Sequence, residues 1–330
     1  MFSTLFVEKG DNRGKSLAKA AGVTGSTPFR LRPIGPFRLD LTAWVLRRRP
    51  ENRVDRWDGE RYERTFAAGR GVFEVFVTQA RAGEAPELEV TLSGDLYGRT
   101  RAKMSRVIAT MLGTEVDLSG FSRMLSLDGR LAGLAGPFEG LKPPRFPTVF
   151  EALVNGIVFQ QLSLATGVAL LNRLVTACGP ASGSGSHAFP SPSEILALDA
   201  SRLRGLGFSF SKARTLLDSA AAASEGLLDA EGLAGMSDDE VLAVLQPLKG
   251  VGRWTAEYVL LRGLGRLSVF PGDDVGARNK LCTWLNLTHD LDYAAVKAIT
   301  AAWQPYAGLV YFCLLLKGLA ERGYLRPGGG

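Results

Sequence analysis

The sequence predicts an α+β protein in which a small domain with an antiparallel sheet precedes a longer, all-helical region. Alternation typical of strands is confined to the first third of the 330 residues, at 37–41, 72–77 and 88–92. Past Pro147 the apolar residues recur at helical spacing instead. We therefore expect an N-terminal mixed domain at residues 29–120 and a helical region at residues 121–330.

The elements of the predicted mixed domain follow from local pattern. Phe37, Leu39 and Leu41 alternate, the run 72–77 is β-branched and aromatic, and the run 88–92 alternates again. Between the first two, residues 41–49 are consistent with a short helix. Residues 99–113 predict a helix with one apolar face. Residues 1–28 mix Gly, Lys, Ser and Thr with little periodicity, and we expect a mobile basic extension there.

The predicted helical region begins with one long helix from Phe150 to Cys178. Residues 179–192 are rich in Ser, Gly and Pro and predict a loop. Further helical segments are expected at 193–199, 211–224, 237–245, 253–263, 275–285, 293–302 and 306–322.

Composition and charge restrict the class of protein. Hydrophobic residues make up 46% and charged residues 22%, values typical of a globular chain. The net charge is +6, and residues 1–60 hold 12 basic against 7 acidic groups, while residues 246–330 hold 10 against 6. A basic balance favours polyanionic partners such as nucleic acid, although +6 alone is weak support.

Cysteine usage and hydropathy indicate the compartment. The three cysteines, Cys178, Cys282 and Cys313, are too few for a zinc cage, a four-thiolate iron–sulfur cluster or a disulfide framework. The apolar residues before Glu8 are too short a run for a signal peptide, and the run 309–316 is too short to span a bilayer. We expect a soluble, cytoplasmic protein with no membrane partner.

A tight Gly-x-Gly turn, Gly250-Val251-Gly252, separates two predicted helices near residues 245 and 253. Glycines let the backbone approach a ligand closely, and the N–H groups at the start of the second helix favour an anion. Backbone donors would hold a phosphate without reading sequence. Such a turn alone is weak support, because it often only punctuates two helices.

Two features beside the turn indicate that it does more than connect two helices. Trp254, Tyr258 and Arg262 are spaced to share one helix face, although core aromatics with a solvated arginine would give the same pattern. The segment Phe270-Pro271-Gly272-Asp273-Asp274 then places two carboxylates at the start of the next helix. Aspartate is a preferred N-cap, so one carboxylate suffices for the helix and the other is free for chemistry.

These residues carry a family resemblance. LKGVGRWTAEYVLLRG, followed by FPGDDVG with Asp274 22 residues past Gly252, resembles the helix-hairpin-helix DNA glycosylase superfamily. Within it, the chain is similar to the 3-methyladenine DNA glycosylase II branch over roughly residues 35–325. The segments FEALVNGIVFQQLSLATGVALLNRL, LRGLGFSFSKARTLLDSA and Trp303-Gln304-Pro305-Tyr306 resemble further family elements in the same order.

The resemblance implies roles for individual residues. The catalytic carboxylate falls on Asp274, and the base-stacking aromatics fall on Trp254, Tyr258 and Trp303. The residue that enters the duplex falls on Gln161, where the best-known member has a leucine, with Leu162 as the alternative.

The resemblance also implies how the protein would hold the DNA backbone. The hairpin phosphate site falls on Gly250 and Gly252, with Lys249 and Arg253 as phosphate contacts. In the family a monovalent cation is bound by hairpin carbonyls, which here belong to Gln246, Leu248 and Val251. Otherwise no cofactor is implied, and the three cysteines exclude the branch that has an iron–sulfur cluster.

Position 254 bears on the reaction type. Superfamily members that also cut the strand have a lysine nucleophile two residues after the second hairpin glycine, and this chain has Trp254 there. An indole cannot form a Schiff base, so the resemblance implies a monofunctional enzyme.

The expected function is excision of alkylated purines from damaged double-stranded DNA in base-excision repair, by a monomer associated with the nucleoid. Cation–π attraction of about 0.5–2 kcal/mol would favour a cationic alkylated base only modestly, so the lability of the damaged bond must supply the rest. Two alternatives remain: a glycosylase for oxidised or deaminated bases, and a non-catalytic hairpin module that only binds DNA. A catalytic role for Asp274 separates the enzymes from the module.

Overall fold

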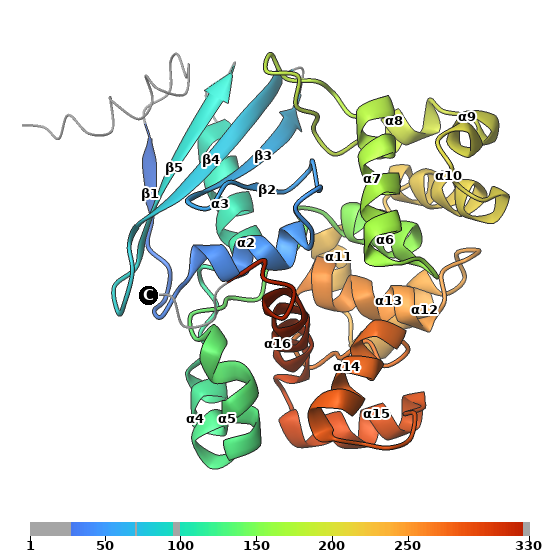
Figure 1. Cartoon of the computed structure of the whole chain (residues 1–330). Coiled ribbons are helices and arrows are strands. Elements are labelled where there is room, and N and C mark those ends of the chain that lie inside the picture. Colours follow the sequence, from blue (N-terminus) through green and yellow to red (C-terminus); the bar gives the residue numbers. More distant parts are fainter. Residues whose placement is uncertain (1–27, 70, 95–99, 326–330) are drawn as a thin grey trace, which may run out of the picture.

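The computed structural model describes residues 28–69, 71–94 and 100–325. Its sheet has five antiparallel strands in the order β1-β5-β4-β3-β2. The strands are β1 (Phe29–Leu31), β2 (Arg56–Trp57), β3 (Arg61–Ala68), β4 (Gly71–Arg81) and β5 (Glu87–Gly94). Figure 1 shows the sheet on one side of the molecule and the helices α6 to α16 beside and below it. The predicted α+β class, with the sheet first and the helices after it, is confirmed.

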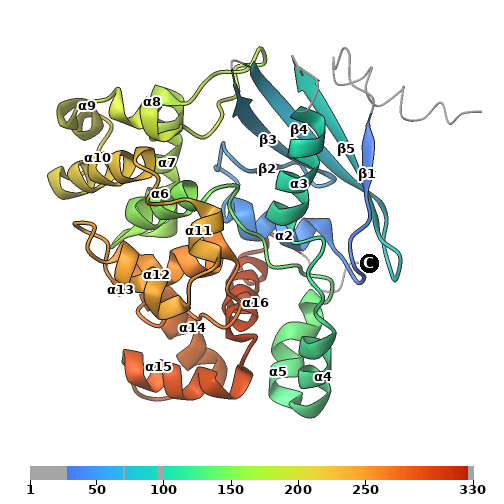
Figure 2. The ribbon, with the colours of Figure 1, turned by 180° about the vertical axis from the view of Figure 1, so that it is seen from behind.

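Two helices belong to the sheet domain, α2 (Leu39–Arg47) and α3 (Thr100–Leu112). Seen from behind, α3 lies against one face of the sheet (Figure 2). The apolar residues Ile108, Met111 and Leu112 of this helix pack in one core cluster with alternate residues of β4 and β5. This period-2 burial explains why the runs 72–77 and 88–92 were recognisable as strands.

The first predicted strand is wrong. Leu39 and Leu41 begin helix α2, in which every residue from Leu39 to Leu46 except Asp40 is buried. A helix that is buried nearly all round has apolar residues at any spacing, so the alternation of Phe37, Leu39 and Leu41 did not indicate a strand. The strands β1, β2 and β3 were not predicted, because their half-buried residues include several Arg and Glu side chains.

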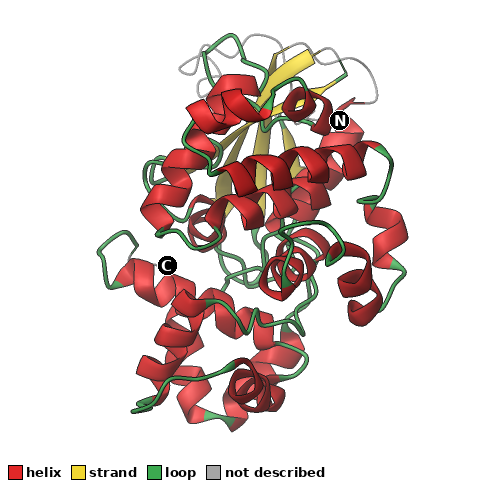
Figure 3. Ribbon diagram, turned by 90° about the vertical axis from the view of Figure 1, so that its right-hand side faces the viewer, coloured by secondary structure: helices red, strands yellow, loops and turns green. Residues whose placement is uncertain are grey.

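The rest of the described chain is helical. Its elements are α4 (Ser119–Leu127), α5 (Gly129–Ala135), η1 (Gly136–Phe138), α6 (Val149–Phe159), α7 (Leu164–Cys178), α8 (Pro192–Leu196), α9 (Ala200–Gly205), α10 (Phe210–Ser224), α11 (Ala230–Ala234), α12 (Asp238–Leu245), α13 (Arg253–Val259), η2 (Leu260–Leu264), α14 (Val275–Leu285), α15 (Tyr293–Thr300), η3 (Ala301–Trp303) and α16 (Ala307–Ala320). Figure 3 shows helices in front of the sheet and below it.

The single long helix predicted from Phe150 to Cys178 is wrong, because the chain turns between α6 and α7. Gln161 in this turn adopts a positive φ of 53°, and the Ser163 side chain accepts a hydrogen bond from the Thr166 backbone N–H to begin α7. The apolar spacing continues through the turn, so the periodicity alone does not reveal the break.

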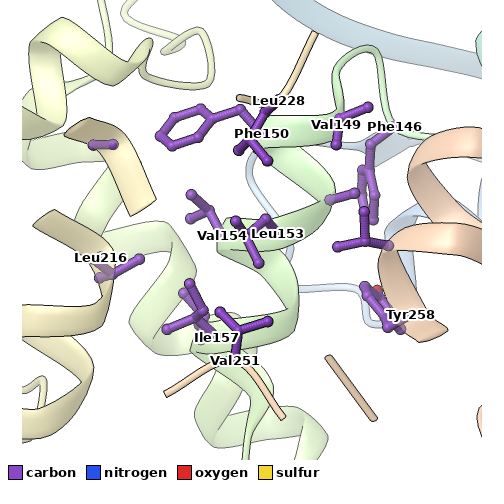
Figure 4. Packing of buried hydrophobic residues seen from close by; sticks show 14 of the residues in the cluster. Phe146, Val149, Phe150, Leu153, Val154, Ile157, Leu216, Leu228, Val251 and Tyr258 are labelled. Atoms are coloured by element: carbon purple, nitrogen blue, oxygen red, sulfur yellow. The ribbon is translucent and has the colours of Figure 1, made fainter. Parts of the chain in front are cut away.

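Two hydrophobic cores hold the helical region. One surrounds α6, where Leu153, Val154 and Ile157 are fully buried (Figure 4) and contact Leu216 of α10 and Val251 of the hairpin within the same cluster. The other joins α14 to α16 with α5 and with Leu41, Trp44 and Val45 of α2. Helix α2 therefore ties the sheet domain to the last helices of the chain.

Buried charges also join the sheet domain to α6. Arg64 of β3 forms ion pairs with Asp55 at 2.7 Å and with Glu151 of α6 at 2.5 Å, and all three side chains are buried. Burial raises the pKa of Glu151 to about 7, against the opposing effect of the Arg64 charge. A broken pair here would leave a buried charge without a partner, so this network fixes the position of the sheet domain on the helices.

Within the described residues, no single helix is long and apolar enough to cross a membrane; only α15–η3 and α16 taken together pass such a test, across a bend of 105°. The basic extension predicted for residues 1–28 falls, except for Pro28, outside the described part of the chain. The boundaries of the two predicted domains stay predictions.

Candidate active site

A cleft of about 900 Å³ opens between the hairpin, the α6–α7 turn and the first turn of α14. Its walls come from segments far apart in the sequence, including the end of α2 and the middle of α16. The lining residues include Arg48, Phe159, Gln161, Lys212, Gly250, Trp254, Tyr258, Asp274, Lys280 and Tyr311.

Asp274 lies in this cleft and also caps helix α14. Its Oδ1 accepts a hydrogen bond from the Ala277 backbone N–H at 2.8 Å, which satisfies one free donor of the helix. Its Oδ2 accepts hydrogen bonds from Trp254 Nε1 at 3.2 Å and from the Tyr311 hydroxyl at 3.0 Å. Three donors on two oxygens fix the orientation of the carboxylate before any ligand enters.

Asp273 makes different contacts from its neighbour Asp274. Its carboxylate pairs with the Arg253 guanidinium at 2.8 Å, and that guanidinium also stacks over the Tyr293 ring at 3.5 Å. Tyr293 donates a hydrogen bond to Glu257 Oε1, and Glu257 Oε2 accepts one from the Gly272 backbone N–H. These contacts hold the Pro271–Asp274 turn against α13. Sequence reasoning assigned capping and chemistry to separate carboxylates, whereas here Asp274 caps and also faces the cleft.

Two of the three predicted base-pocket aromatics line the cleft. The rings of Trp254 and Tyr258 lie 5.7 Å apart, and both belong to α13. Trp303 is not brought to them: it is 6% exposed in the second core, with its ring 5.5 Å from that of Trp284. Sequence reasoning missed Tyr311, which contacts Asp274 directly and sits within a continuous apolar run that gave no sign of a polar role.

Tyr311 can act only as a hydrogen-bond donor to Asp274. Burial, followed by the charge of Asp274, raises the pKa of its hydroxyl well above the ordinary value. Its ring is held by edge contacts with Phe270 and Phe312, at centroid distances of 5.5 and 5.9 Å. The hydroxyl therefore stays protonated and has little freedom to move.

Both hairpin glycines lie at the cleft, but only Gly250 has a local conformational reason to be glycine. Gly250 has a φ of +84°, and a Cβ there would meet Thr215 Oγ1 at 2.2 Å. Gly252 has an ordinary φ of −85°, and a Cβ there would meet no atom within 4 Å. The first glycine is required by the fold, and the second leaves the backbone at the start of α13 open to a ligand.

The two predicted phosphate contacts beside the hairpin, Lys249 and Arg253, differ in exposure and in pairing. Lys249 is exposed on the hairpin and does not line the cleft. Arg253 is exposed over about half of its side chain but is already paired with Asp273. Gln160, which sequence reasoning missed, donates to the Gly250 carbonyl at 2.9 Å and to Thr255 Oγ1 at 2.8 Å, so the α6–α7 turn is fastened to the hairpin.

Both candidates for the duplex-entering residue lie on the rim of the cleft. Gln161 is exposed at the tip of the turn, and Leu162 beside it is 37% exposed. Lys212 of α10 supports the turn from below by donating to the carbonyls of Val158 and Gln160, each at 2.7 Å. Burial lowers the pKa of Lys212 to about 8.

The three carbonyls expected to hold a cation belong to the turn between α12 and α13. The Leu248 carbonyl accepts a hydrogen bond from the Val251 N–H at 2.9 Å, and a carbonyl oxygen has a second lone pair for a cation. Oxygen donors of this kind suit a hard cation. Among the residues that the structure describes, no group of three His, Cys, Asp or Glu side chains could hold a metal ion.

Two further cations, Lys280 and Arg48, also line the cleft. Lys280 of α14 is half-buried against α16, and burial lowers its pKa against the effect of Asp274. Arg48 reaches the cleft from the C-terminal end of α2 and donates to the Tyr258 hydroxyl at 3.3 Å. No local signal marks Arg48, because it stands in the run Arg47-Arg48-Arg49 and only the fold distinguishes it.

Comparison with known proteins agrees with this geometry. The family described as "HhH-GPD superfamily base excision DNA repair protein" matches residues 154–305. The chain is 30% identical over 220 residues to DNA-3-methyladenine glycosylase 2 of Escherichia coli, covering 64% of this chain and 72% of that protein.

Solved structures show a similar fold. A 3-methyladenine DNA glycosylase from Archaeoglobus fulgidus superposes with a TM-score of 0.75 at 24% identity, over 87% of this chain and 97% of that one. The 3-methyladenine DNA glycosylase of Schizosaccharomyces pombe in complex with abasic DNA superposes with a TM-score of 0.52 at 28% identity, over 59% and 94%. With its hairpin, its aspartate and these relatives, the chain belongs to the HhH-GPD superfamily of base-excision DNA repair proteins.

Proposed function

We propose that this protein is a monofunctional DNA glycosylase of the 3-methyladenine type, which excises alkylated purines from double-stranded DNA in base-excision repair. One observation carries the proposal: the Asp274 carboxylate is fixed by Trp254 and Tyr311 within a cleft walled by aromatic rings. A module that only binds DNA has no need of such a group. The curated relative in Escherichia coli named for this activity supports the substrate class.

The reaction requires the target nucleotide to leave the duplex, at a cost of a few kcal/mol that is lowest for damaged or mispaired bases. The base enters the cleft against the rings of Trp254 and Tyr258, whose π faces attract an electron-poor base. As the C1′–N bond breaks, its electron pair leaves with the base and positive charge develops on the sugar. The Asp274 carboxylate stabilises that charge, and water then adds at C1′ and releases a proton to solvent.

The residues around the cleft have separate proposed roles in holding DNA. The N–H groups of Gly250 and Gly252 take a phosphate, with Lys249 and Arg253 beside them. Gln161 fills the vacancy in the duplex, with Leu162 as the alternative. A monovalent cation bound by the carbonyls of Gln246, Leu248 and Val251 would add positive charge at the same turn; no other cofactor is required.

Absence of strand cleavage is part of the proposal, because an indole at position 254 cannot attack an abasic sugar. Treating the protein with abasic duplex and borohydride tests this. A covalent adduct would show that another amine, such as that of Lys280, acts as a nucleophile. We further propose that the protein acts as a monomer in the cytoplasm, associated with the nucleoid.

The decisive experiment compares two neighbouring carboxylates. Duplexes that carry 3-methyladenine or 7-methylguanine are incubated with the wild type, Asp274→Asn and Asp273→Asn, and released bases are quantified by chromatography. We expect Asp274→Asn to lose about 10²–10³-fold in single-turnover rate, the range for removal of one preorganised electrostatic group, while it still binds abasic duplex. Asp273→Asn loses the ion pair with Arg253 and should lose far less. Unchanged release by Asp274→Asn would refute the assignment.

A further inference from the structure

Glu257 is a buried carboxylate of α13 that lies outside the cleft lining. It is 2% exposed, although the next residue, Tyr258, lines the cleft. Its two oxygens accept hydrogen bonds from two other segments: Oε2 from the Gly272 backbone N–H at 3.0 Å, and Oε1 from the Tyr293 hydroxyl at 2.7 Å. Glu257 therefore joins α13 to α15 and to the turn before α14, and it can affect a reaction in the cleft only through the residues that it holds.

The turn that Glu257 holds carries Asp274. The Asp274 backbone N–H donates to the Pro271 carbonyl at 3.1 Å, which closes the turn, and Gly272 lies within it. A Cβ on Gly272 would meet the Tyr293 ring at 2.7 Å, so this ring packs directly against the turn. A displacement of about 1 Å at a catalytic group can cost about 10²-fold in rate. The anchoring of Gly272 therefore bears on the position of Asp274.

We propose that Glu257 is a positioning residue, whose ionised carboxylate anchors the Pro271–Asp274 turn to α13 and so orients Asp274 toward the sugar. This inference rests on the proposed glycosylase function. The ionised form accepts from both donors at once. Protonation turns one of its oxygens into a donor, to which the Tyr293 hydroxyl can adapt by rotating and accepting, but hydrogen bonds to a neutral group have roughly half the strength. The turn is then held less firmly, and base release slows.

The groups that face Glu257 determine where this protonation occurs. Burial, the largest influence, raises the pKa of Glu257 above its ordinary value of 4.5, and the charge of Asp273 adds to the rise. The Tyr293 hydroxyl, the N–H from the turn and the charge of Lys297 oppose it, and Arg253 also attracts Glu257 while paired with Asp273. Removal of the Tyr293 hydroxyl or of the Lys297 charge should therefore raise the pKa further.

Unfolding through Glu257 would have the opposite pH dependence. Because its pKa is raised in the folded protein, the folded state binds this proton more tightly than the unfolded state does. The stability that Glu257 contributes is thus fully present below its unfolded pKa and is lost as pH rises through the folded value. A fall in rate on acidification cannot come from unfolding through Glu257.

The experiment measures single-turnover release of 7-methylguanine from duplex DNA across about pH 5–8, the range in which a raised carboxyl pKa is visible. It compares the wild type with Glu257→Gln and with the control Glu225→Gln, an exposed residue at the end of α10 that does not line the cleft. We expect the wild-type rate to fall toward the acid end. Glu257→Gln should be about tenfold slower at neutral pH, as for a charged hydrogen bond replaced by a neutral one, and should lose this acid limb. Glu225→Gln should match the wild type.

Two more variants move the acid limb without touching the carboxylate. Tyr293→Phe keeps the ring against Gly272 but removes one donor, so the limb should shift upward by about one pH unit, the order of one hydrogen bond to a charged group. Lys297→Met removes an exposed charge and should shift the limb in the same direction by less, because solvent screens it. Affinity for abasic duplex should stay within about threefold of the wild type, as for a typical surface substitution.

The outcomes separate this inference from the proposed function. A wild-type rate that does not fall on acidification, or an acid limb that Glu257→Gln retains and Tyr293→Phe does not shift, would overturn the role of Glu257 alone. The same holds if Glu257→Gln loses rate, abasic affinity and melting temperature together and keeps the limb. The wild-type profile and Lys297→Met need no buried substitution, so they decide the question even if Glu257→Gln does not fold. Wild type that releases no 7-methylguanine at any pH would overturn the glycosylase function itself.

Discussion

Tyr311→Phe is the most informative single substitution in this site, because it removes one hydroxyl and nothing else. The ring packs edge-on against Phe270 and Phe312, and phenylalanine keeps both contacts. The hydroxyl donates at 3.0 Å to Asp274 Oδ2, the oxygen that faces the cleft. After its removal Trp254 Nε1 still donates to that oxygen.

The expected size of the effect follows from the bond that is lost. A hydrogen bond to a charged group contributes about 1.5–3 kcal/mol. If that energy serves to orient the carboxylate toward the sugar, most of it appears in the barrier, and each 1.4 kcal/mol is a tenfold change in rate. We expect the single-turnover rate of base release to fall by about 10–100-fold, with little change in affinity for duplex DNA.

Rapid-quench measurement at saturating enzyme isolates the bond-breaking step from product release. Thermal unfolding of the same variant checks that the fold is intact. A rate within about twofold of the wild type, against the tenfold or greater loss expected from one charged hydrogen bond, would mean that Tyr311 does not orient Asp274. A large fall in melting temperature with the same fall in rate would mean that the hydroxyl acts through stability.

Two further predictions concern the hairpin and the turn beside it. Gly250→Ala should lower the free energy of unfolding by at least about 1–2 kcal/mol, the cost of left-handed backbone for an L-residue, and the new Cβ would also clash with Thr215. Gly252→Ala should leave the urea denaturation curve nearly unchanged but weaken binding to duplex DNA. The reverse pattern would contradict the roles assigned to the two glycines. Lys212 has a pKa lowered to about 8, so its charge is lost between pH 7 and 9. Duplex affinity should fall over that range in the wild type, as measured by fluorescence anisotropy, and Lys212→Gln should remove the step. Because the folded pKa lies below the unfolded value of 10.5, this group favours the folded state more as pH rises above 8, so weaker binding there cannot be attributed to unfolding through Lys212.

The predicted site residues that line one cleft, Trp254, Tyr258 and Asp274, lie close together in the chain. Trp254 and Tyr258 come from α13 and Asp274 from the turn that begins α14, the next α-helix, so a local motif fixes their relation. Tyr311 contacts Asp274 from 37 residues further along, and Arg48 contacts Tyr258 across 210 residues. Contacts of that range depend on how the domains pack, and no spacing in the sequence encodes them.

The secondary structure shows the same contrast between features set by local sequence signals and features set by tertiary packing. Helix α14 matches its predicted range, residues 275–285, because Asp274 caps one end and Asn286 ends the other in a left-handed conformation. The break between α6 and α7 was missed because no Gly or Pro marks it. Trp303 was expected in the base pocket by its motif, but the short helix η3 directs it into the core against Trp284.

The double role of Asp274 determines which substitution can test its chemistry. Its Oδ1 caps α14 while its Oδ2 faces the cleft, so the cap fixes the rotamer that the reaction needs. Alanine at this position would remove the charge and also the cap, which is worth about 1 kcal/mol. Asparagine caps about as well as aspartate, so Asp274→Asn removes the charge and leaves the helix start intact. Loss of base release in that variant, with α14 still folded, would therefore report on the carboxylate's charge alone.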